Sequence, residues 1–427
     1  MKDMTRGNIS SQLIRFSIPL VLGNLFQLTY NAVDSIVVGR FAGEEALAAV
    51  GAAGPVMNIV ILGITGICIG ASVLMSEYFG AGSHEKLKQE IATTLLFGFY
   101  FSLVIVGLGV FFSGGIIRLL RVPEEISEDA AVYLRVILIG TPFTFFYNGV
   151  ASALRSVGDS KTPVHFLAMA SVLNALLDLV FVAGFHMGVF GAAFSTVIAE
   201  AVSALLCISY IYKKVPLLKL KPKEFRMDRE LLSLTVKQGA VTALQQSCQP
   251  IGKLLIQGVI NPLGVSTIAA FQAVNRVDDF AFTPEQSISS GMMTFVAQNR
   301  GAGNGERVKK GFRTGLFIEA GYWVIICIVI LLVKEPVMRL FVPNGDGAMV
   351  RIGAEYLHLM AFFLSAAGVY QWDPGFFPGN GKYVHHLNLH PDPDLRPGGI
   401  GHPAGSVYGN EWSSICMPGR MGLYAAL

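Results

Sequence analysis

Charged residues are scarce in this 427-residue chain. Asp, Glu, Lys and Arg together make up 14% of it, whereas about a quarter of an ordinary soluble domain is charged. Hydrophobic residues make up 52%, and the formal net charge is only +3. This composition is typical of an integral membrane protein, and the small net charge does not suggest a nucleic-acid partner.

Cysteines are also few, and their spacing forms no pairs. Four of the five lie in apolar stretches, which favours packing over disulfide or metal chemistry. One His- and Asp-rich segment, residues 385–394, resembles a metal cluster, but its prolines deny it the regular fold that a zinc site needs. We find no nucleophile with a base, and no other metal set, so we predict neither an enzyme nor a bound cofactor. The cysteines are Cys68, Cys207, Cys248, Cys327 and Cys416.

Long apolar stretches dominate the chain instead. A bilayer core needs about 20 residues per helix, and ten stretches are long enough. Alternating strands of a membrane barrel are missing from the pattern. We therefore predict an all-α, multi-pass membrane protein. The stretches are 12–38, 47–78, 92–117, 130–154, 164–186, 189–212, 235–260, 266–297, 312–333 and 348–370.

Basic residues collect in alternate loops. They precede the first stretch and follow the second, fourth, sixth and eighth, and the largest group lies between Lys213 and Arg229. Because cytoplasmic loops carry an excess of Lys and Arg, this pattern predicts a cytoplasmic amino terminus.

The second half of the chain repeats features of the first at a nearly constant offset. Gly80-Ala81-Gly82 recurs as Gly301-Ala302-Gly303, and residues 117–123 recur as residues 338–343. Both halves begin on the same side, which indicates parallel repeats related by an axis along the membrane normal. We predict two six-helix lobes, with an amino-terminal lobe at 1–212, a cytoplasmic linker at 213–230 and a carboxyl-terminal lobe at 231–370.

The last segment, Gln371 to Leu427, does not continue this plan. It holds seven of the nineteen prolines and no apolar run long enough to span a membrane. Reading the back-translated sequence one nucleotide later permits an apolar continuation that matches Asn148 onward. We therefore expect residues 371–427 to be an out-of-frame tail that replaces the last two helices and leaves this chain inactive. The alternative is a genuine polar tail.

Two carboxylates interrupt the apolar stretches of the first half, Asp34 and Asp178. A charge near the middle of a bilayer costs several kcal/mol on most scales, so such a residue is a candidate for handling an ion or a substrate. Asn174 lies four residues before Asp178, so both side chains project from one helix face.

Over residues 8–370 the chain resembles the bacterial branch of the multidrug and toxic compound extrusion (MATE) family. This resemblance implies export of amphipathic or cationic organic compounds in exchange for Na⁺ or H⁺. It also implies that Asp34, Asn174, Asp178 and Thr196 form the coupling site, and that Pro19 lets the first helix bend. The matching elements are Pro19, Asp34, Asn174 to Asp178, Thr196, Arg276-Val277-Asp278, Pro284 and the two Gly-Ala-Gly turns.

The residue types do not decide between Na⁺ and H⁺ as the coupling ion, and some of the residues have alternative roles. Carboxylate, amide and hydroxyl oxygens suit Na⁺, whereas two neighbouring carboxylates suit H⁺. Asp34 could instead be a structural residue bonded to Tyr30, Asn24 or Thr196. Asn148 could be a hydrogen-bond link between helices. Tyr30 and Asn148 are also candidates for lining a cavity.

The second half differs at the matching position. Lys253 aligns with Asp34, and a lysine in an apolar helix needs a partner. Asp278 or Asp279 is the obvious candidate. Either a structural ion pair or a second, substrate-coupled site would fit.

Other function classes stay open at this point. A lipid-linked precursor flippase shares the predicted plan, but its cavity would carry several cations, whereas this amino-terminal lobe carries carboxylates. We expect the partners to be small-molecule drugs or metabolites and the lipid bilayer, and we expect a monomer.

Overall fold

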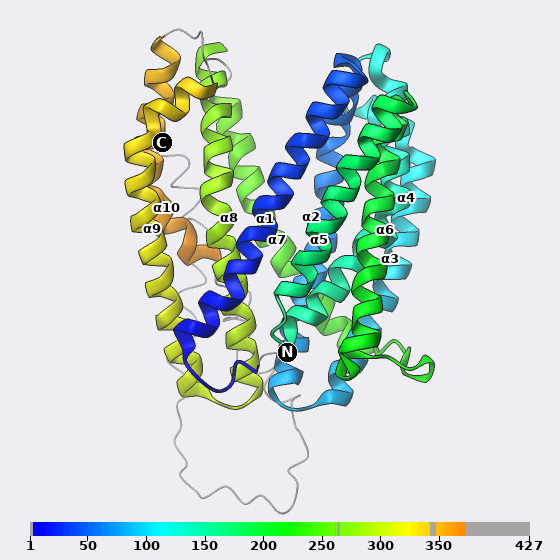
Figure 1. Cartoon of the computed structure of the whole chain (residues 1–427), viewed down its shortest axis with the longest axis vertical. Coiled ribbons are helices and arrows are strands. Elements are labelled where there is room, and N and C mark those ends of the chain that lie inside the picture. Colours follow the sequence, from blue (N-terminus) through cyan, green and yellow to red (C-terminus); the bar gives the residue numbers. More distant parts are fainter. Residues whose placement is uncertain (1–2, 261, 263–264, 342–346, 372–427) are drawn as a thin grey trace, which may run out of the picture. The chain divides into compact units, whose positions relative to one another are not determined.

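The computed structural model describes residues 3–260, 262, 265–341 and 347–371. Over these ranges the chain is almost entirely helical, and no strand occurs in them (Figure 1). The helices are α1 (Ile9–Phe41), α2 (Glu44–Gly80), α3 (His84–Leu119), α4 (Glu124–Ser156), α5 (Lys161–Asp178), α6 (Gly188–Lys214), α7 (Arg229–Ile260), α8 (Val265–Gly301), α9 (Gly305–Phe341) and α10 (Gly347–Gln371).

Every predicted apolar stretch coincides with a helix or, for 164–186, with α5 and the short helix that follows it, so the all-α membrane class is confirmed. Polar caps extend the helices past the apolar runs. The Asn8 side chain, for example, accepts a hydrogen bond of 3.0 Å from the Ser11 amide at the start of α1. In the described part of the chain, seven helices are long and apolar enough to cross a membrane, α1 to α6 and α9. The other three predicted spans, α7, α8 and α10, stay a prediction.

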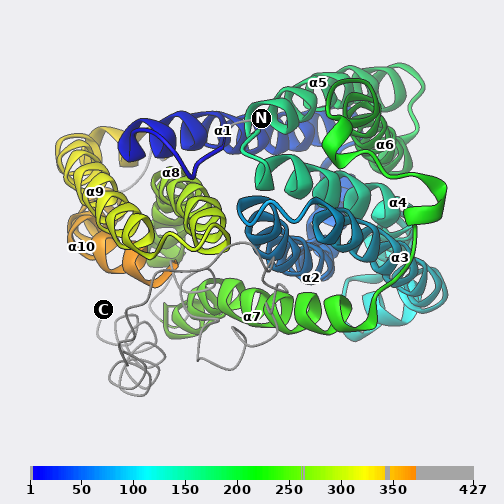
Figure 2. The ribbon, with the colours of Figure 1, turned by 90° about the horizontal axis from the view of Figure 1, so that it is seen from below.

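Most of the described packing belongs to one compact unit, residues 1–247 together with 278–319. Within it α4 packs against α2, α3 and α6, and α1 packs against α5. Figure 2 shows α4 between α3 and α6. The lobe boundaries at 212, 230 and 370 stay a prediction.

The second unit contains residues 248–277 and the described part of 320–427. Its helices are linked by polar and aromatic contacts. The indole nitrogen of Trp323 donates to the Ala361 carbonyl at 3.0 Å, and the rings of Phe271 and Tyr356 lie 6.0 Å apart. The Gln272 amide donates to Gln257 at 2.8 Å.

Both Gly-Ala-Gly turns have the same geometry. After α2, the amide of Gly82 donates to the Phe79 carbonyl and Ser83 to Tyr78; after α8, Gly303 and Asn304 make the equivalent bonds. Gly82 and Gly303 have φ of +68° and +69°, a conformation that favours glycine at a helix end. The sequence repeat is thus a structural repeat at these turns.

The predicted linker is short and tied to α3. It forms two 3₁₀ turns, Pro216–Leu218 and Pro222–Glu224. The Glu224 carboxylate accepts from the Lys221 amide at 2.6 Å and lies 3.4 Å from the Lys88 ammonium. These contacts lower the pKa of Glu224, the Lys221 amide most of all.

Candidate functional site

Asp178 and Asn174 are both buried on one face of α5, at 0% and 1% exposure. The Ser195 hydroxyl of α6 donates to the Asp178 carboxylate. When the Asn174 side chain is oriented with its amide nitrogen toward Asp178, that nitrogen donates to the Asp178 carboxylate at 3.1 Å. The side-chain oxygen of Asn174 then accepts from the Thr196 amide at 3.1 Å and from the Thr196 hydroxyl at 3.3 Å. Three of the four residues expected at the coupling site therefore form one hydrogen-bonded group.

The backbone changes character directly after Asp178. Residues Leu179–Gly184 form a π-helical segment that continues α5. Such wider turns are rare and frequently occur at functional sites, because they redirect neighbouring side chains. The segment places Asp178 at the junction of two helix types.

Asp34 reaches this group from α1. Its carboxyl group lies within hydrogen-bonding range of the Asp178 carboxyl. One of its oxygens, Oδ1, is buried and has no hydrogen-bond partner among the described residues. The structure thus brings all four expected residues together: Asp34, Asn174, Asp178 and Thr196.

Two tyrosines border the carboxylates. Tyr30 of α1 lies close to Thr196 and within electrostatic range of Asp34. Tyr133 of α4 interacts electrostatically with both aspartates. Sequence reasoning missed Tyr133 and Ser195. Ser195 had one usable signal, since it directly precedes Thr196, whereas Tyr133 is placed by helix packing alone.

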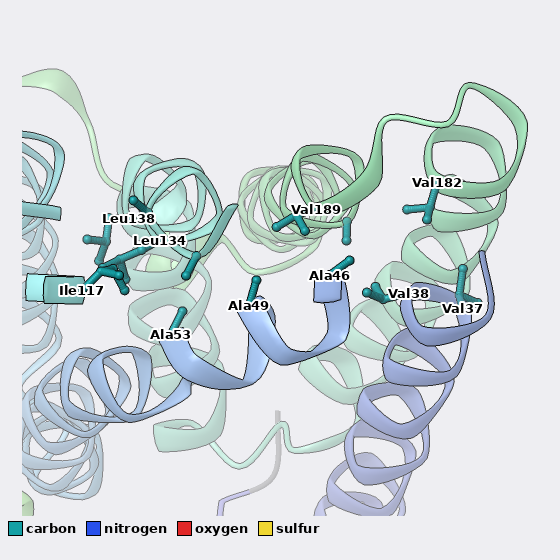
Figure 3. Close-up of a cluster of buried hydrophobic side chains, with 13 residues drawn as sticks. Val37, Val38, Ala46, Ala49, Ala53, Ile117, Leu134, Leu138, Val182 and Val189 are labelled. Carbon is teal, nitrogen blue, oxygen red and sulfur yellow. The ribbon is translucent and has the colours of Figure 1, made fainter. Parts of the chain in front are cut away.

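An apolar cluster (Figure 3) begins about one helical turn after each aspartate. Val38 follows Asp34 by one turn of α1, and Val182 follows Asp178 by four residues. The cluster also takes small residues from α2 and larger ones from α4, and its buried members are at most 6% exposed. Close packing of this kind excludes water. The labelled members are Val37, Val38, Ala46, Ala49, Ala53, Ile117, Leu134, Leu138, Val182 and Val189.

The remaining candidates lie elsewhere. Pro19 is partly buried within α1, which stays a single helix from residue 9 to residue 41. The Asn148 amide donates to the Thr144 carbonyl of its own helix at 2.8 Å. It therefore does not make the interhelical bond that sequence reasoning had considered.

Lys253, Asp278 and Asp279 lie in α7 and α8. Asp278 is buried at 7% exposure, and Lys253 and Asp279 are partly buried. Lys253 belongs to one unit of the chain and both aspartates to the other, so their pairing stays a prediction. The proposed out-of-frame tail and the His- and Asp-rich segment lie outside the described residues, apart from Gln371.

Known proteins match most of the chain. The MatE family model matches residues 19–180 and 242–385. The probable multidrug resistance protein YpnP of Bacillus subtilis is 32% identical over 86% of this chain and 82% of its own length. The probable multidrug resistance protein NorM of Thermotoga maritima is 26% identical over 84% and 78%.

The solved structures agree on the fold. An outward-facing multidrug resistance MATE family transporter of the MOP superfamily has a TM-score of 0.80 at 23% identity, covering 87% of this chain and 82% of that one. Fold and sequence thus define a multi-pass membrane transporter rather than an enzyme. This chain belongs to the MATE family, and several of its bacterial relatives are named multidrug resistance or multidrug export proteins.

Proposed function

We propose that this protein exports an amphipathic or cationic organic molecule in exchange for Na⁺ or H⁺, and that Asp34 and Asp178 bind the coupling ion. One observation carries the proposal: two carboxyl groups meet within hydrogen-bonding range, and one of their oxygens, Oδ1 of Asp34, is buried without a partner among the described residues. Two ionised carboxylates at such a distance repel each other, so the pair favours a proton or a cation between them.

The surrounding groups support the binding of either ion. Ser195 and the Asn174 amide nitrogen hold the Asp178 carboxylate in place. The Thr196 hydroxyl contacts Asn174 and is an oxygen ligand of the kind that Na⁺ accepts. A shared proton would need no further ligand. The coupling ion is therefore a question for measurement.

The apolar cluster restricts the route by which an ion can reach the site. Because packed side chains begin about one helical turn after each aspartate, an ion must enter and leave from another side. Pro19 lacks a backbone N–H and so removes one hydrogen bond from α1, the helix that carries Asp34. We propose that filling and emptying of the carboxylate pair bends α1 at Pro19 and thereby changes access for the exported molecule.

The proposal is tested by measuring whether the coupling ion changes the affinity of the protein for an exported molecule. The affinity of the purified chain for radiolabelled tetraphenylphosphonium should depend on Na⁺ concentration or pH, because two ligands coupled through one protein change each other's affinity. Asp34→Asn and Asp178→Asn should remove that dependence. Ser35→Ala is the matched control, since the Ser35 hydroxyl bonds only to its own helix at Asn31. A dependence that persists in both Asn variants would contradict the proposal.

We also propose that the amino terminus is cytoplasmic, that the protein is a monomer in a bacterial plasma membrane, and that residues 371–427 are read out of frame. The loop charges support the first of these. Labelling of a cysteine introduced at Thr5, with a reagent that cannot cross the membrane, should occur only in inside-out vesicles. Light scattering of the purified chain in detergent tests its oligomeric state.

A further inference from the structure

Glu200 is an acidic residue that the coupling site does not use. It lies four residues after Thr196 on α6 and therefore on the same helix face. The Thr144 hydroxyl of α4 donates to its Oε2 atom. A carboxylate in an apolar membrane helix is costly unless it has a function or a partner, and one hydroxyl is a weak partner for a full charge.

The surroundings of Glu200 connect it to the two aspartates. Tyr30 interacts electrostatically with both Asp34 and Glu200. Tyr133 interacts with Asp34, Asp178 and Glu200. Two tyrosines from different helices are thus within electrostatic range of Glu200 and of at least one of the aspartates, so Glu200 lies in the same part of the fold as the coupling pair.

Glu200 nevertheless differs from Asp178 in its contacts. Asp178 is fully buried and held by Ser195 and Asn174. Glu200 is partly exposed, and within the described ranges its Oε1 atom has no hydrogen bond and its carboxylate no ion pair with Lys or Arg. One oxygen is therefore oriented by Thr144, while the other remains able to accept a ligand.

We propose that Glu200 is the counter-ion for the positive centre of the exported molecule, while Asp34 and Asp178 hold the coupling ion. This assignment rests on the proposed function and adds a substrate class to it, organic monocations. Tyr30 and Tyr133, which lie within electrostatic range of Glu200, carry aromatic rings of the kind that attracts organic cations. Thr144 is a positioning residue, because it fixes the carboxylate without contacting the cargo.

A matched pair of ligands tests the role of charge. Tetraphenylphosphonium carries one positive charge, and triphenylphosphine oxide is an uncharged relative with similar rings. With the purified full chain, Glu200→Gln should weaken binding of the cation about tenfold or more, the scale of one lost charge contact. The Kd of the neutral compound should change less than about twofold, since ring contacts are kept.

Two further variants keep the test decisive if Glu200→Gln folds poorly. Glu200→Asp keeps the charge and should bind the cation more tightly than Glu200→Gln. Thr144→Val should weaken cation binding to a smaller extent. Wild-type cation affinity in Glu200→Gln, equal losses for both ligands, or no binding of the cation by the unaltered chain would overturn the assignment. Failure of the proposed function has a different signature, namely unchanged Na⁺ and pH dependence in Asp34→Asn and Asp178→Asn.

Discussion

The two halves of the chain differ in how polar side chains are distributed along their helices. All six helices of the first half, α1 to α6, are apolar enough to cross a membrane, and the polar groups of α5 and α6 gather within a few turns around Asp178. Helices α7 and α8 are as long but fall short of that apolarity. Their polar residues are spread along the helix, as at Lys253 and Arg276. By this measure of apolarity the first six helices and α9 qualify as spans, whereas α7, α8 and α10 of the second half do not.

The repeat shows the same asymmetry at one contact. Glu77 and Gln298 occupy equivalent positions, each one helical turn before the first glycine of a Gly-Ala-Gly turn. A Cβ on Gly80 would collide with the Gln298 carbonyl, and one on Gly301 with the Glu77 carbonyl, so the backbone packing is symmetric. The side chains are not symmetric. Glu77 forms an ion pair with Arg300, whereas the Gln298 amide donates to the Ser156 carbonyl at 2.6 Å.

The largest effect should come from the reading frame of the second half. If one nucleotide was lost or gained just before the codon for Gln371, correcting it should restore two apolar segments and convert an inactive gene into one that confers dye efflux. The decisive measurement is the nucleotide sequence at that point. A neighbouring frame that does not encode an apolar continuation matching Asn148 onward would leave the tail as a genuine segment.

The next largest effect should come from neutralising Asp34 or Asp178 in the first half. In a gene with an intact second half, Asp34→Asn or Asp178→Asn should abolish gradient-driven efflux, because the acceptor for the coupling ion is lost. Insertion and folding should stay near normal, since a neutral amide is cheaper to bury than a carboxylate. Dye efflux from cells and protein amounts in the membrane check both points. Wild-type efflux in either variant would exclude the coupling role.

Three of the four candidate site residues could be singled out from the sequence for physical reasons, whereas Thr196 was expected only from the resemblance to the MATE family. Asp34 and Asp178 are conspicuous because charge is rare in apolar helices, and the four-residue spacing of Asn174 and Asp178 fixes their common face. Tyr133 was not accessible in this way. A tyrosine in an amphipathic helix is ordinary, and only the packing of α4 beside α6 brings it to the carboxylates.

Some features of the fold could likewise be predicted from the sequence, and others could not. Helix positions were predictable, because each needs about 20 apolar residues in succession. The π-helical segment at 179–184 was not, since no residue in it demands a wider turn. Of the two roles considered for Asn148, the hydrogen bond between helices is not the one observed, because a side-chain amide can bond its own helix as readily as a neighbouring one; the cavity role stays a prediction.

The ion pair predicted for the second half should affect stability rather than coupling. Lys253→Met alone should lower the free energy of unfolding by about 3 kcal/mol, because removing one partner of a buried pair leaves an uncompensated charge. The double variant in which the partner aspartate, Asp278 or Asp279, also becomes Asn should lose less. Denaturant unfolding in detergent measures both. Equal losses in the single and double variants would argue against the pair.

A smaller loss should follow from filling the symmetric glycine contact. Gly80→Ala and Gly301→Ala should each destabilise the protein by about 1–3 kcal/mol, since overpacking against a backbone carbonyl forces the helices apart. Gly107→Ala is the matched control, because nothing lies within 4 Å of a Cβ there and alanine favours a helix. Thermal unfolding compares the three. If Gly80→Ala were as stable as Gly107→Ala, α2 and α8 would not be in close contact.

The smallest effect is expected at Asn148, and it separates the site from other polar residues of the first half. Asn148 bonds only to the Thr144 carbonyl of its own helix, which already has an intrahelical partner, so Asn148→Ala should change stability by less than about 1 kcal/mol. Ion-dependent binding of tetraphenylphosphonium should also be kept. Asn174→Ala is the contrasting variant: it removes contacts to both Asp178 and Thr196 and should weaken that ion dependence strongly. A loss in Asn148→Ala as large as in Asn174→Ala would extend the coupling site from α5 and α6 onto α4.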